Sequence, residues 1–197
     1  MEMPKKYDET VGITGEYESL EPGGYICRIK NVKEEESKNK NRMLVVAFDI
    51  EEGEHKGFYQ RRYNDLVQQN NDPNNVIKWP NNGIHRIMIE DKNGDCNKFF
   101  KGFITSVENS NEGYNFKENK FDEKTLKDKL FGGIFGEEEY ERMDGSIGTS
   151  TKLKYVRTVQ AIRDGKYKIP DIKKLPAKGE AFEDFLSNAS QDDDLPF

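Results

Sequence analysis

The sequence predicts a mainly β domain with one or two helices, built as an OB-like Greek-key barrel of about five strands with a long disordered C-terminal tail. Two observations support this fold class. Short segments of strand character occur before and after one helical segment, an order that suits a small Greek-key barrel. After Pro170 the chain becomes linker-like, with Pro176, Gly179 and small polar residues. An unrelated α+β domain fits the same pattern and stays open.

The first strands are expected in the N-terminal half. Residues 25–30 alternate in strand fashion after a turn, and residues 43–50 are apolar on both alternating faces, which predicts a central strand buried on both sides. The polar run 34–41 between them predicts a loop. Residues 57–64 resemble the returning strand. Residues 66–83, with six asparagines and two prolines, predict a long irregular excursion.

The second half begins with the expected helix. Between 97 and 108 the apolar residues fall on one helical face, and Asp95 or Asn97 can cap its start. Residues 122–127 predict a further helical turn. Two β segments follow, at 129–142 and 152–163, with a turn at 144–146. Within the first of them, "FGGIFG" (131–136) predicts a strand with a bulge rather than a phosphate loop, because acidic residues follow it directly.

The chain divides accordingly into an N-terminal arm (1–20), an OB-like domain (21–170), a flexible linker (171–191) and an acidic tip (192–197). The formal net charge of −6 lies mainly at the end. The last 21 residues hold one lysine and six acidic residues, a net of −5, which leaves −1 for the rest. The acidic balance therefore says little about what the body binds.

Most kinds of chemistry are not supported by the residues present. Cys27 and Cys96 are too few and too far apart for a disulfide framework or a metal set, and His55 and His85 read as solvated side chains. No nucleophile and base stand at a meaningful spacing. We therefore expect neither an enzyme nor a metal or other cofactor. With no signal peptide or membrane span in the sequence, the expected location is the cytoplasm, or the host cytoplasm for a phage protein.

Basic and aromatic residues alternate in two segments. In "FYQRRYND", a strand would place Tyr59, Arg61 and Tyr63 on one face, a platform on which unstacked bases can lie. The alternative, that these tyrosines line a barrel, stays open. Trp79 either stacks on a base or plugs the barrel end. The predicted DNA-binding residues are Arg28, Lys30, Tyr59, Arg61, Arg62, Tyr63, Trp79, Lys152, Lys154, Tyr155, Arg157 and Arg163.

The ending "DDDLPF" resembles the acidic tip of bacterial single-stranded-DNA-binding proteins, in which a flexible linker joins an OB-fold body to a tip that recruits replication, recombination and repair enzymes. The partner-binding residues that this resemblance implies are Asp192, Asp193, Asp194, Leu195, Pro196 and Phe197. Physical chemistry supports the same role. Phe197 offers a ring and a free carboxylate to one pocket, and Pro196 lowers the ordering cost of binding.

The body resembles a different group. The segments "FFKGFITSVENSN", "LFGGIFGEEEYE" and "VRTVQAIRDGKYKIPDIKKLP" are similar to a family of phage and mobile-element proteins from Gram-positive hosts, regarded as single-strand-binding proteins with an OB-like body. The resemblance spans roughly residues 23–176 and assigns no DNA-contacting residues. It implies sequence-independent binding and protection of single-stranded DNA during replication and recombination, with a homo-oligomer possible. A recruitment adaptor without DNA binding, or a strand-annealing recombination mediator, remains the alternative.

Overall fold

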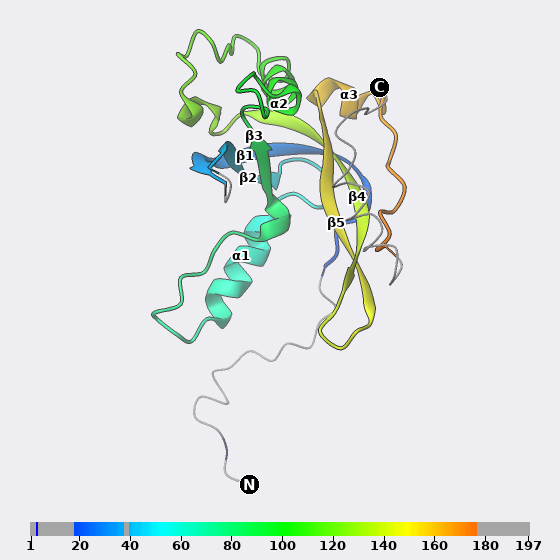
Figure 1. Cartoon of the computed structure of the whole chain (residues 1–197). Helices are drawn as coiled ribbons and strands as arrows, with labels where there is room; N and C mark the ends of the chain where they lie inside the picture. The colour runs from blue at the N-terminus through cyan, green and yellow to red at the C-terminus, as the bar shows by residue number, and fades with distance from the viewer. Residues whose placement is uncertain (1–2, 4–17, 38–39, 177–197) are drawn as a thin grey trace.

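The computed structural model describes residue 3, residues 18–37 and residues 40–176, and within them the fold is mainly β (Figure 1). The five strands are β1 (Gly23–Glu36), β2 (Arg42–Ile50), β3 (Ile84–Met88), β4 (Leu130–Glu141) and β5 (Ile147–Arg157). The α-helices are α1 (Phe58–Gln69), α2 (Lys98–Glu108) and α3 (Val159–Arg163), and two 3-10 turns are η2 (Asn81–Gly83) and η3 (Glu123–Leu126).

The strands form one antiparallel sheet in the order β3-β2-β1-β4-β5. The edge strands β3 and β5 approach each other where the sheet curls, and the side chain of Asn82, just before β3, donates to Ser150 Oγ of β5 at 2.8 Å. This is the connectivity of a partly open OB-type barrel, which has five strands and Greek-key links. The predicted fold class is confirmed, with three α-helices in place of one or two.

Helix α2 covers the apolar interior of the curled sheet. Asn97 caps it, because the side chain accepts a hydrogen bond from Phe99 N at 2.9 Å. The buried side chains of α2 include Phe103, whose ring meets that of Phe131 on β4 at 5.6 Å between centroids. The predicted helix and one of its two candidate caps are therefore confirmed.

The strand predicted at 43–50 is also confirmed. Leu44 and Phe48 on one face of β2 and Val45 on the other are all buried, so both faces of the strand are covered. The loop predicted at 34–41 is wrong in part. Strand β1 continues to Glu36, which pairs with Arg42 at the start of β2, so only residues 37–41 lie between the two strands.

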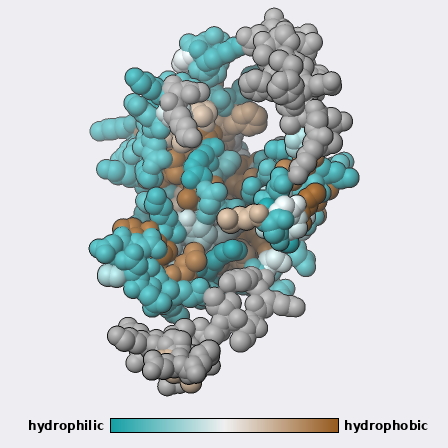
Figure 2. All heavy atoms as spheres, turned by 60° about the horizontal axis from the view of Figure 1, so that its bottom comes forward, coloured by the Kyte–Doolittle hydropathy of each residue, from teal (hydrophilic) through white to brown (hydrophobic). Residues whose placement is uncertain are grey.

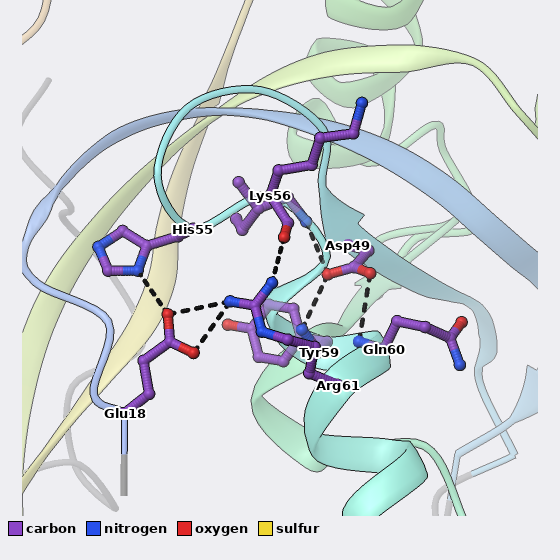
Figure 3. A network of polar contacts seen from close by, with 8 residues as sticks. Glu18, Asp49, His55, Lys56, Tyr59, Gln60 and Arg61 are labelled. Atoms are coloured by element: carbon purple, nitrogen blue, oxygen red, sulfur yellow. Dashed lines mark hydrogen bonds and ion pairs between the residues drawn. The ribbon is translucent and has the colours of Figure 1, made fainter.

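The returning strand predicted at 57–64 is wrong, because this segment begins helix α1. The N-cap residue before the helix is Gly57, which has no side chain to cap it. Its first turn is bonded instead by Asp49 of β2, which accepts from Tyr59 N at 2.8 Å and Gln60 N at 3.2 Å (Figure 3). A partner distant in sequence therefore satisfies the backbone donors that a helix start leaves open.

The second predicted β segment, 152–163, is wrong at its end. Strand β5 stops at Arg157, and Thr158 caps α3 by accepting from Ala161 N at 3.2 Å. Helix α3 lies on the outer face of β4 at Gly132, where an added Cβ would be 2.5 Å from Ile162 Cγ1 and 2.7 Å from the carbonyl oxygen of Thr158. The bulge predicted within 131–136 is confirmed by a register shift between Ile134 and Phe135.

The chain after α3 returns along the outside of the β4–β5 hairpin (Figure 1). Lys173 forms a parallel bridge with Glu138, and its backbone N donates to the carbonyl oxygen of Glu137 at 3.0 Å. Residues 171–176, the start of the predicted linker, contain this attachment to β4. The rest of the linker and the tip lie outside the described residues.

The last residues of the predicted arm also belong to the folded body. Leu20 is buried in the core, and Glu18 is bonded to α1 through Arg61 at 2.9 Å. The irregular segment predicted at 66–83 begins as the last four residues of α1, runs without regular structure to Pro80, and ends in η2. None of the described helices combines the length and the apolar character needed to cross a bilayer.

Candidate nucleic-acid interface

The platform predicted from "FYQRRYND" does not form, since its residues lie on a helix. Tyr59 is 1% exposed and packs against Phe48, so its ring cannot receive a base. Burial raises the pKa of the Tyr59 phenol, and its hydroxyl has no partner among the described residues. Tyr63 lies against Trp79, with 5.6 Å between ring centroids.

The sequence leaves two roles open for Trp79, stacking on a base or plugging the barrel end. Its ring is half-buried against the core, and its Nε1 donates to the carbonyl oxygen of Phe48 at 3.2 Å. The solvated state predicted for His85 is wrong, because this side chain is partly buried beside Phe103, and burial lowers its pKa to about 4. His55 is bonded to Glu18, with 3.0 Å from Nδ1 to Oε1.

Several predicted cations are held by neighbouring acceptors. Arg28 pairs with Glu51 at 2.7 Å and also donates to the carbonyl oxygen of Asp128 at 2.7 Å. The Arg61 guanidinium is shared between Glu18 and the carbonyl oxygen of Lys56 (Figure 3).

Three further predicted cations have different neighbours. Arg163 pairs with Glu52 at 2.7 Å. Lys30 is half-buried on β1 and contributes to a lowered pKa of Glu51. Arg62 is exposed on α1 and lines a groove described below. Arg28 and Lys30 therefore both act on Glu51, and Arg163 pairs with the next residue, Glu52.

A continuous basic surface does exist on the outer side of β5, and we call it the basic strip. It combines four of the predicted residues with two lysines from the segment that follows α3. Its members are Lys152, Lys154, Tyr155, Arg157, Lys168 and Lys173. The strip has five cationic side chains, and Glu138 and Asp171 are acidic neighbours of it.

One carboxylate forms ion pairs with three of these lysines. Glu138 lies 2.9 Å from Lys154 Nζ, 3.4 Å from Lys152 Nζ and 3.4 Å from Lys173 Nζ. The hydrogen bond from Lys154 and the three positive charges lower the pKa of Glu138 to about 2, so it is ionised at neutral pH. A single negative charge cannot neutralise three ammonium groups. Two positive charges therefore remain available to an anion, as a phosphate-binding surface requires.

The other end of the strip carries its aromatic group. Tyr155 is 50% exposed and borders a shallow cavity of about 370 Å³ together with Arg157 and Lys168. A half-exposed phenol ring between two cations can stack on a base while the cations contact the adjacent phosphates.

Lys168 and Lys173 were not identified from the sequence, because they lie in the region read as domain end and linker. They reach the strip because β4 has no side chain at Gly132 and Gly136 on its outer face. At Gly136 an added Cβ would be 2.5 Å from Pro170 Cγ. The sequence signal for this packing is the pair of glycines, because glycine in a strand often marks a site where another segment of the chain approaches closely.

A groove of about 660 Å³ opens beside the strip, between α1 and the β4–β5 hairpin, the two elements that project at the lower end of Figure 1. Figure 2 views this end and shows apolar side chains among mostly polar ones. Residues 18–22 and 80–82 complete the groove walls. Lys152 belongs to both surfaces, because it lines the groove and also pairs with Glu138 of the strip.

Within the described residues, no group of three or more His, Cys, Asp and Glu side chains is arranged to hold a metal ion. The predicted partner-binding tip, Asp192 to Phe197, lies outside those residues. A comparison with protein-family models and with curated proteins finds no match to this chain. The functional reading therefore depends on the barrel, the basic strip and the groove.

Proposed function

We propose that this protein binds single-stranded DNA without sequence preference, with phosphates on the basic strip and a base on Tyr155. The observation that supports this most directly is the set of three lysines around Glu138, which leaves uncompensated positive charge beside an exposed aromatic ring. The OB-type connectivity adds to it, because barrels of this kind commonly bind oligonucleotides. Cations that track the backbone and a ring that stacks on any base give binding independent of sequence.

The test is a fluorescence titration of the full chain with labelled oligo-dT at about 50 and about 200 mM salt. Binding should weaken linearly on a logarithmic salt scale, with a slope near −0.7 for each phosphate neutralised. The variant Arg157→Gln/Lys168→Gln should lower affinity about tenfold and make the slope shallower by about 1.4, because two phosphate contacts are lost.

The matched control is Lys117→Gln/Lys124→Gln, which removes the same charge from two exposed lysines outside the strip. It should change affinity less than about twofold, since screening weakens charges beyond a Debye length. Absence of saturable binding by the wild type at low salt overturns the proposal and favours the adaptor. If both double variants lose the same affinity for oligo-dT, the basic strip is not the DNA-binding surface.

We further propose that the acidic tip recruits replication, recombination and repair proteins while the body holds DNA. Deletion of Asp192 to Phe197, or Phe197→Ala, should abolish co-purification of such enzymes with the immobilised protein. The same deletion should leave affinity for oligo-dT equal or slightly higher, because it removes three carboxylates that repel phosphate. A large loss of DNA affinity in the truncated protein contradicts this division of labour.

A further inference from the structure

The groove between α1 and the β4–β5 hairpin differs in chemistry from the strip beside it. Its charged lining residues are three carboxylates, Glu18, Glu21 and Glu137, and two cations, Arg62 and Lys152. The balance is slightly negative, so the groove does not attract a phosphate backbone. A volume of about 660 Å³ in a surface of this charge suits an uncharged ligand or an uncharged part of one.

The remaining lining residues are those that contact nucleobases well. Asn81, Ser150 and Thr149 supply amide and hydroxyl groups, which can pair with the edge of a base. Leu66 and Tyr140 supply apolar surface on opposite sides, at 40% and 42% exposure. Base edges need hydrogen-bond partners and base faces need flat apolar contacts, so the lining offers both.

The ring of Tyr140 is held in place by the hairpin itself. It lies over Gly148 of β5, where an added Cβ would be 2.9 Å from Tyr140 Cζ. Leu66 lines the groove from α1, one turn beyond Arg62. The groove therefore presents one aromatic and one aliphatic face to any ligand that enters.

We infer that the groove receives unstacked nucleobases of the strand whose phosphates lie on the basic strip. This inference rests on the proposed function. Lys152 is the point of contact between the two surfaces, so a strand can keep its backbone on the lysines while its bases turn into the groove. Paired bases of a duplex cannot turn in this way, so the inference predicts a preference for single strands.

The experiment compares oligo-dT with an abasic oligomer of equal length, which has the same phosphates and no bases. The wild type should bind oligo-dT at least tenfold more tightly than the abasic oligomer. Leu66→Ala/Tyr140→Ala should weaken binding of oligo-dT about fivefold and change binding of the abasic oligomer less than twofold. The single variant Tyr140→Phe keeps the ring, so it should bind oligo-dT as tightly as the wild type does.

The strip variant Arg157→Gln/Lys168→Gln serves as the reference, because it should weaken both oligomers to a similar degree. The groove inference is overturned if Leu66→Ala/Tyr140→Ala weakens both oligomers equally or leaves oligo-dT binding unchanged. Both outcomes leave the strip proposal standing. If the wild type binds neither oligomer, the proposed function itself fails. Thermal unfolding of each variant verifies that a loss of binding is not a loss of fold.

Discussion

Replacement of Asp49 by alanine is expected to destabilise the protein by about 3 kcal/mol, the sum of a lost helix cap and of buried donors left without partners. Asp49 is 1% exposed, and its carboxylate accepts from three backbone N–H groups, those of Ile50, Tyr59 and Gln60. Water cannot replace these bonds at a buried site. The loss should be visible as a lower midpoint in urea at unchanged m-value.

The matched controls separate the cap from the charge. Asp49→Asn keeps one acceptor oxygen and should cost about 1 kcal/mol, less than alanine. Asp65→Ala removes an exposed carboxylate from the same helix and should change stability by less than about 0.5 kcal/mol. If the alanine variants at 49 and 65 have equal stability, Asp49 does not act as the cap of α1.

Stability should also depend on pH through Asp49. Burial is the largest influence on this carboxyl group and raises its pKa above 3.8, although the three N–H donors oppose the shift. The folded protein therefore retains a proton that the unfolded chain has already released. The stability from this group is fully present below pH 3.8 and is lost as the pH rises through the raised pKa. The penalty of Asp49→Asn should shrink over the same window, as urea unfolding at several pH values can show.

Asp49 also explains why α1 was not predicted from the sequence. In "FYQRRYND" the prediction assumed a strand, because the alternate positions 59, 61 and 63 would then place two tyrosines and an arginine on one face. The helix is favoured by a cap from another element, and no local pattern reveals such a cap. A weaker signal was present. Phe58, Arg62 and Leu66 are spaced four residues apart, and all three line the groove.

The barrel could be predicted because its strands and α2 carry their own periodic patterns. Buried β2 and the capped α2 each form where the pattern places them. The basic strip could be predicted only in part. Tyr155 and Arg157 are close together in the sequence, whereas Lys168 and Lys173 join them through packing against β4. Contacts between distant segments decide which cations share a surface, and charge patterns along the chain do not contain that information.

Replacement of Gly132 by alanine is expected to destabilise the protein by about 2–3 kcal/mol, the usual cost of an overpacked site without room to relax. The new Cβ would meet backbone as well as side chain, at 2.7 Å from the carbonyl oxygen of Thr158 and 3.0 Å from that of Arg157. Backbone atoms cannot rotate away as a side chain can. Relief therefore requires α3 to move off the outer face of β4.

The same movement should affect binding, because α3 leads directly into the segment that carries Lys168 and Lys173. We expect Gly132→Ala to weaken binding to oligo-dT about tenfold under conditions in which the variant is still folded, since the strip loses two of its five cations. A shallower salt slope should accompany the loss. The measurements are urea unfolding and the two-salt titration on the same preparation.

The control is the same substitution at Gly102 of α2, which is exposed and where an added Cβ meets nothing within 4 Å. Alanine is the better helix former, so Gly102→Ala should raise stability by up to about 1 kcal/mol and leave DNA binding unchanged. If Gly132→Ala lowers the free energy of unfolding and Gly102→Ala raises it, close packing of α3, rather than backbone entropy, determines the stability change at Gly132. If Gly132→Ala is as stable as the wild type and binds DNA equally well, the close approach of α3 to β4 does not build the strip.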